Sequence, residues 1–173
     1  MDHNDEHGEW QEYRVKARYL PGTSAVVEER WYDASLEDAL GRSHAPAVLV
    51  WDSDTLNLIR EEHWMMGMLQ SPRSDEIPAI TEYDPINGSP TKRVWMTHHE
   101  KHRAENLPAV EFLKDGKPVR HEYWVRGQLT REDGGPPVVN FDPINGEVIS
   151  TSDKMDRGSQ VIPRPKPSLF RPG

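Results

Sequence analysis

The chain carries four degenerate copies of one unit of about thirty residues, and this repetition restricts its fold more than any other feature. Residues 83–88 read Tyr-Asp-Pro-Ile-Asn-Gly, and residues 141–146 read Phe-Asp-Pro-Ile-Asn-Gly. Successive Trp anchors are 33, 31 and 29 residues apart, and successive Pro anchors are 32, 30 and 28 apart. The anchors are Trp31, Trp64, Trp95 and Trp124, and Pro46, Pro78, Pro108 and Pro136. The spacing drifts between each Trp and the Arg before each Pro, where a loop tolerates length changes.

The repeat predicts how the chain is divided. We expect a repeat domain at 10–150, whose units cover about residues 28–60, 61–92, 93–120 and 121–150. The first unit departs most from the pattern and lacks a glycine at its turn, so we expect residues 10–27 to cap the array with it. Residues 1–9 are acidic, whereas residues 151–173 are basic and rich in proline. Both ends are predicted to be flexible tails.

Each unit favours strands joined by tight turns. Residues 122–125 are mostly aromatic and β-branched, and Arg126-Gly127 follows them as a turn. The Asn-Gly pairs at 87–88 and 145–146 favour the positive φ angles that hairpin turns require. A serine, two leucines and a closing glycine at 35–41 could form one or two helical turns. The sequence therefore predicts an all-β fold, an antiparallel meander of successive β-hairpins that forms an elongated, mostly single-layer sheet.

Composition agrees with a thin structure and narrows the class of partner. Only 35% of the residues are hydrophobic, but six Trp argue against disorder. A net charge of −8 without a basic stripe argues against nucleic acid or an anionic membrane and favours a basic or mixed protein partner. The absence of cysteine removes disulfides and thiol chemistry. Because the sequence shows no apolar leader or membrane span, we expect a cytoplasmic protein.

Over roughly residues 28–150 the chain resembles the MORN-like repeat proteins of bacteria and phages. The similarity rests on Gly67 and Gly127, each three residues after a Trp, on His102-Arg103 before Pro108-Ala109, and on Arg131 before Pro136. In the other two units Ala34 and His98 replace the glycine. The resemblance implies an array of β-hairpins with a scaffolding or protein-binding role, and some members of this type are antitoxins or immunity proteins. A repeat type names an architecture and no specific chemistry.

Aromatic, basic and methionine side chains recur around the turns and are the candidate partner-binding residues. They are Trp64, Met65, Met66, Arg73, Trp95, Arg103, Trp124 and Arg131. The three Trp are expected at equivalent positions, where they form either a core row or an exposed binding row. The arginines either bond loop carbonyls beside the Pro or contact an acidic partner. The methionines either fill a gap between hairpins or form an adaptable contact patch.

One histidine cluster raises the alternative of a metal site. His98 and His102 flank Glu100, but the spacing is not that of the HExxH motif, and the repeat places His98 at a hairpin tip in place of the turn glycine. The cluster is either a solvated turn or a weak zinc or nickel site completed by a residue such as His121. Because no nucleophile elbow, phosphate loop or dinucleotide motif is present, we expect neither catalysis nor a cofactor.

These observations favour a non-catalytic protein-binding repeat module that inhibits its partner, for example an immunity protein, an antitoxin or a phage-encoded inhibitor of a host protein. A basic toxin such as a nuclease would suit the acidic chain. Two alternatives remain open at this point. The module could be a structural scaffold that self-associates through its sheet edges, or a metal-dependent enzyme that uses the cluster from His98 to His102.

Overall fold

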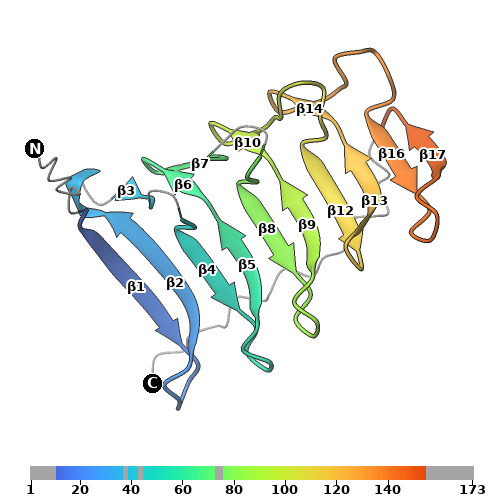
Figure 1. Ribbon diagram of the computed structural model, residues 1–173. Helices are drawn as coiled ribbons and strands as arrows, with labels where there is room; N and C mark the ends of the chain where they lie inside the picture. Colours follow the sequence, from blue (N-terminus) through green and yellow to red (C-terminus); the bar gives the residue numbers. More distant parts are fainter. Residues whose placement is uncertain (1–10, 37–38, 43–44, 73–75, 155–173) are drawn as a thin grey trace, which may run out of the picture.

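The computed structural model describes residues 11–36, 39–42, 45–72 and 76–154, and they form one open antiparallel sheet (Figure 1). Ten main strands lie side by side in chain order, so that each strand pairs with the next along the sequence. They are β1 (Tyr13–Tyr19), β2 (Val26–Asp33), β4 (Val48–Trp51), β5 (Leu58–Glu62), β8 (Ile80–Tyr83), β9 (Pro90–Val94), β12 (Val110–Lys114), β13 (Lys117–Glu122), β16 (Val138–Phe141) and β17 (Val148–Ser152). The predicted all-β meander in one large sheet is confirmed.

Three small hairpins extend the unit beyond what the sequence suggested. They are β6 (Trp64–Met65) with β7 (Met68–Leu69), β10 (Met96–Thr97) with β11 (Glu100–Lys101), and β14 (Trp124–Val125) with β15 (Gln128–Leu129). The two-residue strand β3 (Ala39–Leu40) pairs with β2 at the corresponding place in the first unit. Figure 1 shows these small hairpins in a row along one end of the sheet, and we call this row the small-hairpin ridge.

The ridge is continuous because each small hairpin donates a backbone hydrogen bond to the element before it. The N–H of Gly67 bonds the Leu40 carbonyl at 2.8 Å, and that of Gly127 bonds the Lys101 carbonyl at 3.0 Å. The N–H of His99 bonds the Leu69 carbonyl at 3.2 Å in the same way. His99 therefore occupies the position of the turn glycines, one residue later than expected.

The long hairpins turn at the opposite end of the sheet, where the sequence explains the turns. The Asp84 carboxylate accepts the N–H groups of Ile86 at 2.8 Å and Asn87 at 3.0 Å, and Gly88 then takes a φ of 70°. Only glycine adopts this conformation without a steric cost. Leu56 occupies the same position in the first unit with a φ of 58°, which explains why that turn looked degenerate.

The register assigns every strand residue to one of two faces. Directly paired residues share a face, so an unbroken chain of pairs joins Arg60, Glu82 and Lys92 on what we call the front face. Glu61, Thr81 and Arg93 lie on the back face. Away from the ridge the sheet is a single layer.

The core lies at the ridge end of the sheet. On the front face a row of β-branched residues is buried, namely Val48, Ile80, Val94, Val110 and Val138. Leu69, Met96 and Trp124 from the ridge pack against this row. Ala47, Ala79 and Ala109 beside it are completely buried, which explains the small residue that follows Pro in the repeat. Burying each large aliphatic side chain contributes about 1.5–3 kcal/mol.

The predicted Trp row is wrong. One position of the repeat donates its backbone N–H to the carbonyl of the residue that follows the Pro anchor of the same unit. This position is occupied by Trp31, His63, Trp95 and Tyr123. Trp64 and Trp124 lie one residue later, at the position of Tyr32 and Met96. Successive strand residues point to opposite faces. The four Trp anchors therefore divide between the back face and the front face.

Smaller corrections concern the ends of elements. Of the one or two helical turns considered for residues 35–41, the structure has a single 3₁₀ turn at Ala34–Leu36, and Ala39–Leu40 is a strand. The sheet extends to Ser152, two residues beyond the expected limit of the repeat domain. Tyr13–Tyr19 forms the outermost strand on the N-terminal side. The tail predicted at 1–9 lies outside the described residues, as do residues 155–173 of the tail predicted at 151–173.

Candidate functional site

Cation–aromatic stacks line the back face at the ridge end. Arg42 lies 3.9 Å from the ring centroid of Trp31, Arg103 lies 3.7 Å from that of Trp95, and Arg131 lies 4.2 Å from that of Tyr123. Arg103 also donates to the Pro108 carbonyl at 3.3 Å and to Glu111 at 3.2 Å. Trp95 is only 2% exposed. The stacks hold the loop before each Pro against the sheet.

Of the predicted binding residues, Trp95 is therefore buried. Arg103 and Arg131 hold their loops against the sheet by stacking on aromatic rings. The carbonyl-bonding alternative for the arginines describes Arg103, whose guanidinium bonds Pro108. Arg73 lies outside the described residues. The sequence did not reveal these stacks, because the distance between the aromatic residue and its arginine varies. It is eight residues in two units and eleven in the first.

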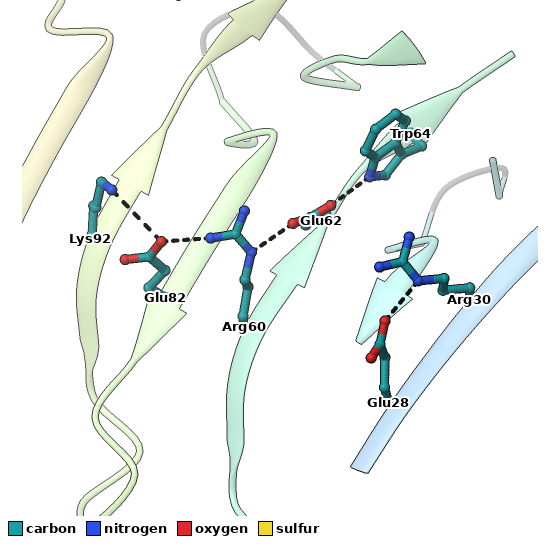
Figure 2. Close-up of polar contacts among 7 residues, drawn as sticks. All are labelled: Glu28, Arg30, Arg60, Glu62, Trp64, Glu82 and Lys92. Carbon is teal, nitrogen blue, oxygen red and sulfur yellow. Dashed lines mark hydrogen bonds and ion pairs between the residues drawn. The ribbon is translucent and has the colours of Figure 1, made fainter. Parts of the chain in front are cut away.

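Trp64 and Trp124 take part in a second repeated arrangement on the front face. Arg60, Glu62 and Trp64 lie at alternate positions, and the Glu62 carboxylate accepts hydrogen bonds from Arg60 Nε at 2.6 Å and from the Trp64 indole at 2.7 Å. Figure 2 shows this arrangement. Arg120, Glu122 and Trp124 repeat it with distances of 3.0 Å and 3.1 Å. Both Trp side chains are half-buried, with their polar edge used internally.

Charged side chains connect this arrangement across neighbouring strands. Glu82 lies between Arg60 Nη1 at 2.7 Å and Lys92 Nζ at 3.7 Å, so that three strands share one row of alternating charge (Figure 2). Such partly exposed ion pairs contribute little to stability singly. Together they keep the open front face polar and fix the orientation of its side chains.

Two large apolar side chains of the small-hairpin ridge reach solvent. Met65 is 38% exposed and Met66 is 61% exposed. Met66 also has a φ of 50°, a left-handed conformation that long side chains rarely adopt. In the same hairpin the Trp64 ring packs edge-on against the His99 ring of the next small hairpin, with centroids 5.8 Å apart. Met65 and Met66 thus lie in the exposed part of the β6–β7 hairpin, whereas Trp95 is buried against Arg103.

The histidine cluster does not assemble a metal site. His98 and His99 lie at the tip of the β10–β11 hairpin with φ angles of 49° and 67°, which agrees with the predicted turn. His121, the proposed further ligand, packs against Phe141 on the back face with ring centroids 4.8 Å apart. Among the described residues no group of three or more His, Cys, Asp or Glu side chains is arranged to hold a metal ion.

Two shallow grooves open directly to solvent. One on the back face has a volume of about 450 Å³ and is lined by Glu61, Arg93, Trp95, Arg103 and Glu111 among others. The second lies at the turns of the long hairpins, has a volume of about 410 Å³ and includes Asn57, Tyr83 and Ile86. In the first groove the Arg93 and Arg103 guanidiniums both contact the Glu111 carboxylate. Neither groove encloses a ligand as a small-molecule site does.

Stability is expected to fall in mild acid because of His63 on the back face. Burial lowers the pKa of His63 below its ordinary value of 6.5, which the nearby Glu61 opposes only in part. The unfolded chain therefore binds more protons as the pH falls below 6.5, and stability that is complete above this pH is progressively lost below it. Urea unfolding between pH 7.5 and pH 5 measures this loss. The change His63→Tyr, which places the residue of the equivalent Tyr123 there, should reduce the pH dependence; an unchanged dependence would contradict the assignment.

No protein-family model matches this chain, and no curated protein or solved structure matches it significantly. In the described part of the chain, no helix has the length and apolar character needed to cross a membrane.

Proposed function

We propose that this protein is a non-catalytic protein-binding module that docks on its partner through the small-hairpin ridge. The observation that carries the proposal is the exposed pair Met65 and Met66 at the tip of the β6–β7 hairpin. Large apolar side chains at a solvent-exposed tip favour contact with another protein, and flexible methionines adapt to the partner surface. Open grooves and a flat polar front face suit a macromolecule better than a small metabolite.

The conformation of Met66 supports this function. A residue other than glycine, asparagine or aspartate is uncommon at a left-handed φ and is held there at a cost of about 1–3 kcal/mol. Asparagine would fit this position of the hairpin turn at least as well as methionine does. His98 and Arg126 take the same conformation at the equivalent turn positions, so Met66 differs from them in presenting an apolar side chain there.

The ridge predicts a specific binding defect. The double change Met65→Ser and Met66→Asn should weaken partner binding by about 10-fold or more, because it removes the central apolar contacts, while thermal stability stays the same or rises. The partner is first captured with the tagged full chain from the native host and then purified. Isothermal titration of the wild-type and variant chains against that partner measures the effect.

The matched control is the pair Ile86→Ser and Ile144→Ser. These residues are 78% and 83% exposed at the turns of two long hairpins, at the other end of the sheet. Their loss removes comparable apolar surface and should leave binding unchanged. Equal losses in the two double variants would show that the ridge is not the docking surface.

In its specific form the proposal is inhibition of the bound partner, as by an immunity protein, an antitoxin or a phage-encoded inhibitor acting in the cytoplasm. Mixing the purified chain with its partner should then abolish the partner's activity at a stoichiometric ratio. The second candidate is a self-associating scaffold. It is supported by β17, an outermost strand of Val, Ile, Ser and Thr without charge, whose Val148 and Ile149 are 57% and 63% exposed. Ultracentrifugation that finds only self-association would favour the scaffold.

A further inference from the structure

The two outermost strands of the sheet differ in a way that points to a partner. No strand of the described chain pairs with the outer side of β1 or with that of β17. β17 is uncharged, whereas β1 alternates cations with uncharged residues along its whole length. Its front-face positions are Arg14, Lys16 and Arg18, and its back-face positions include Tyr13, Val15 and Ala17. All of these except Tyr13 are exposed.

Two cations of β1, Lys16 and Arg18, are only partly neutralised by the sheet. Arg18 Nη2 lies 2.9 Å from Glu28, but Glu28 is shared with Arg30 Nε at 2.7 Å, and the Arg18 side chain remains 64% exposed. Lys16 Nζ lies 4.9 Å from the Tyr32 ring centroid, and it sits directly opposite Arg30 in the register. The Glu28 carboxylate thus serves two cations, Arg18 and Arg30, at this corner of a protein whose net charge is −8.

Several acidic residues of the described chain lie away from this edge. The turns of the long hairpins carry Asp52, Asp84, Asp115 and Asp142, away from the front face of β1. The overall charge, which favoured a basic partner, therefore does not describe this edge. An added strand would place its side chains directly opposite those of β1, at the close spacing where opposite charges attract.

We propose that the outer edge of β1 accepts an extended acidic segment of a protein partner as an additional strand. The segment has carboxylates at alternate positions, facing Arg14, Lys16 and Arg18, and apolar side chains between them, facing Val15 and Ala17. Backbone hydrogen bonds give affinity, and the alternation of side chains gives the register. The inference rests on the proposed protein-binding function and adds the chemistry of the partner.

Other occupants fit this edge less well. A second copy pairing through its own β1 would set cations against cations, which is unfavourable. The β17 strand of a second copy offers no carboxylates to face the cations. A nucleic-acid backbone would bring continuous negative charge past Glu28, Glu62 and Glu82 on the same face.

The test uses the full chain and a fluorescent, end-blocked peptide of seven residues in which Glu and Val alternate. Fluorescence anisotropy should show binding that weakens with salt and is lost when alternate backbone amides of the peptide are N-methylated. The double change Lys16→Gln and Arg18→Gln should weaken binding by about 3- to 30-fold, because two cross-strand charge pairs are lost. The charge-reversed variant Lys16→Glu with Arg18→Glu should no longer bind the Glu peptide and should instead bind a peptide in which Lys replaces each Glu.

The control variant is Lys114→Gln with Lys154→Gln, which removes two exposed cations elsewhere and should bind as the wild type does. Equal binding by the N-methylated peptide, or by the Lys16 and Arg18 variant, would overturn the proposal. It would also be overturned if no peptide bound and the variant instead self-associated, since the cations would then only prevent edge pairing. Binding of a DNA duplex but not of the peptide would overturn it too. Because no natural partner enters this assay, it can fail or succeed independently of the Met65 and Met66 experiment.

Discussion

Replacing Glu122 by alanine is expected to destabilise the protein by about 3–5 kcal/mol. Glu122 is 3% exposed, and its carboxylate accepts hydrogen bonds from Arg120 and from the Trp124 indole. The alanine variant leaves the Arg120 guanidinium, whose side chain is only 12% exposed, without its carboxylate partner. It also leaves the half-buried indole N–H of Trp124 without an acceptor. A loss of this size is a large fraction of the stability of a typical domain. Urea unfolding followed by tryptophan fluorescence measures it.

The second copy of the same arrangement provides the matched control. In Glu62→Ala the partner Arg60 is 35% exposed and also contacts Glu82, so water and a second carboxylate compensate the loss. We expect a cost of about 1–2 kcal/mol there. Glu122→Gln, which keeps an acceptor for the indole, should lie between the two. Equal costs for the two alanine variants would show that burial does not control the strength of this arrangement.

The second large effect concerns Trp95. Trp95→Ala should cost about 3–5 kcal/mol, because it removes a buried aromatic side chain and the surface on which Arg103 stacks. Trp95→Phe should cost much less, about 1–2 kcal/mol, since a ring remains under Arg103. The indole nitrogen of Trp95 is buried without a hydrogen-bond partner, so its removal leaves no acceptor unsatisfied.

Binding measurements separate the structural role of Trp95 from a contact role. The Trp95→Phe variant should bind the partner as the wild type does, whereas a contact Trp in the middle of an interface would lose affinity even on change to Phe. Denaturation and titration of the same two variants therefore distinguish these roles. A stable Trp95→Ala variant with lost binding would contradict the structural assignment.

Much of the fold could be predicted because its determinants are local. The Asp-Pro-Ile-Asn-Gly turns hold their hydrogen bonds within six residues, and the strand-forming residues flank them directly. The chain-order pairing of the main strands follows from such hairpins, since each turn brings neighbours together. The turns at Arg126-Gly127 and His98 were predicted, but the strands of the small hairpins around them were not, because strands of two residues leave too little pattern to detect.

The candidate site was harder to predict, and Trp64 and Trp95 show why. Both follow a strand and precede a turn, and their spacing of 31 residues matches that of the repeat to within one or two residues. In a strand a shift of one residue moves a side chain to the opposite face. Trp64 therefore lies on the front face at the ridge, while Trp95 lies on the back face beneath Arg103. Phe112 likewise lies opposite Arg120 on the front face, whereas Tyr83 of the preceding unit bonds Glu61 of the back face.

The sequence by itself determined the repeat, the turns and the single antiparallel sheet, because these depend on residues close together along the chain. Only the tertiary structure decided how the four units differ in exposure and charge. The register across ten strands selected which Trp are buried, left Met65 and Met66 at the surface and collected cations on β1. Register is set by pairing between strands, and a repeat that drifts by one or two residues per unit does not reveal it.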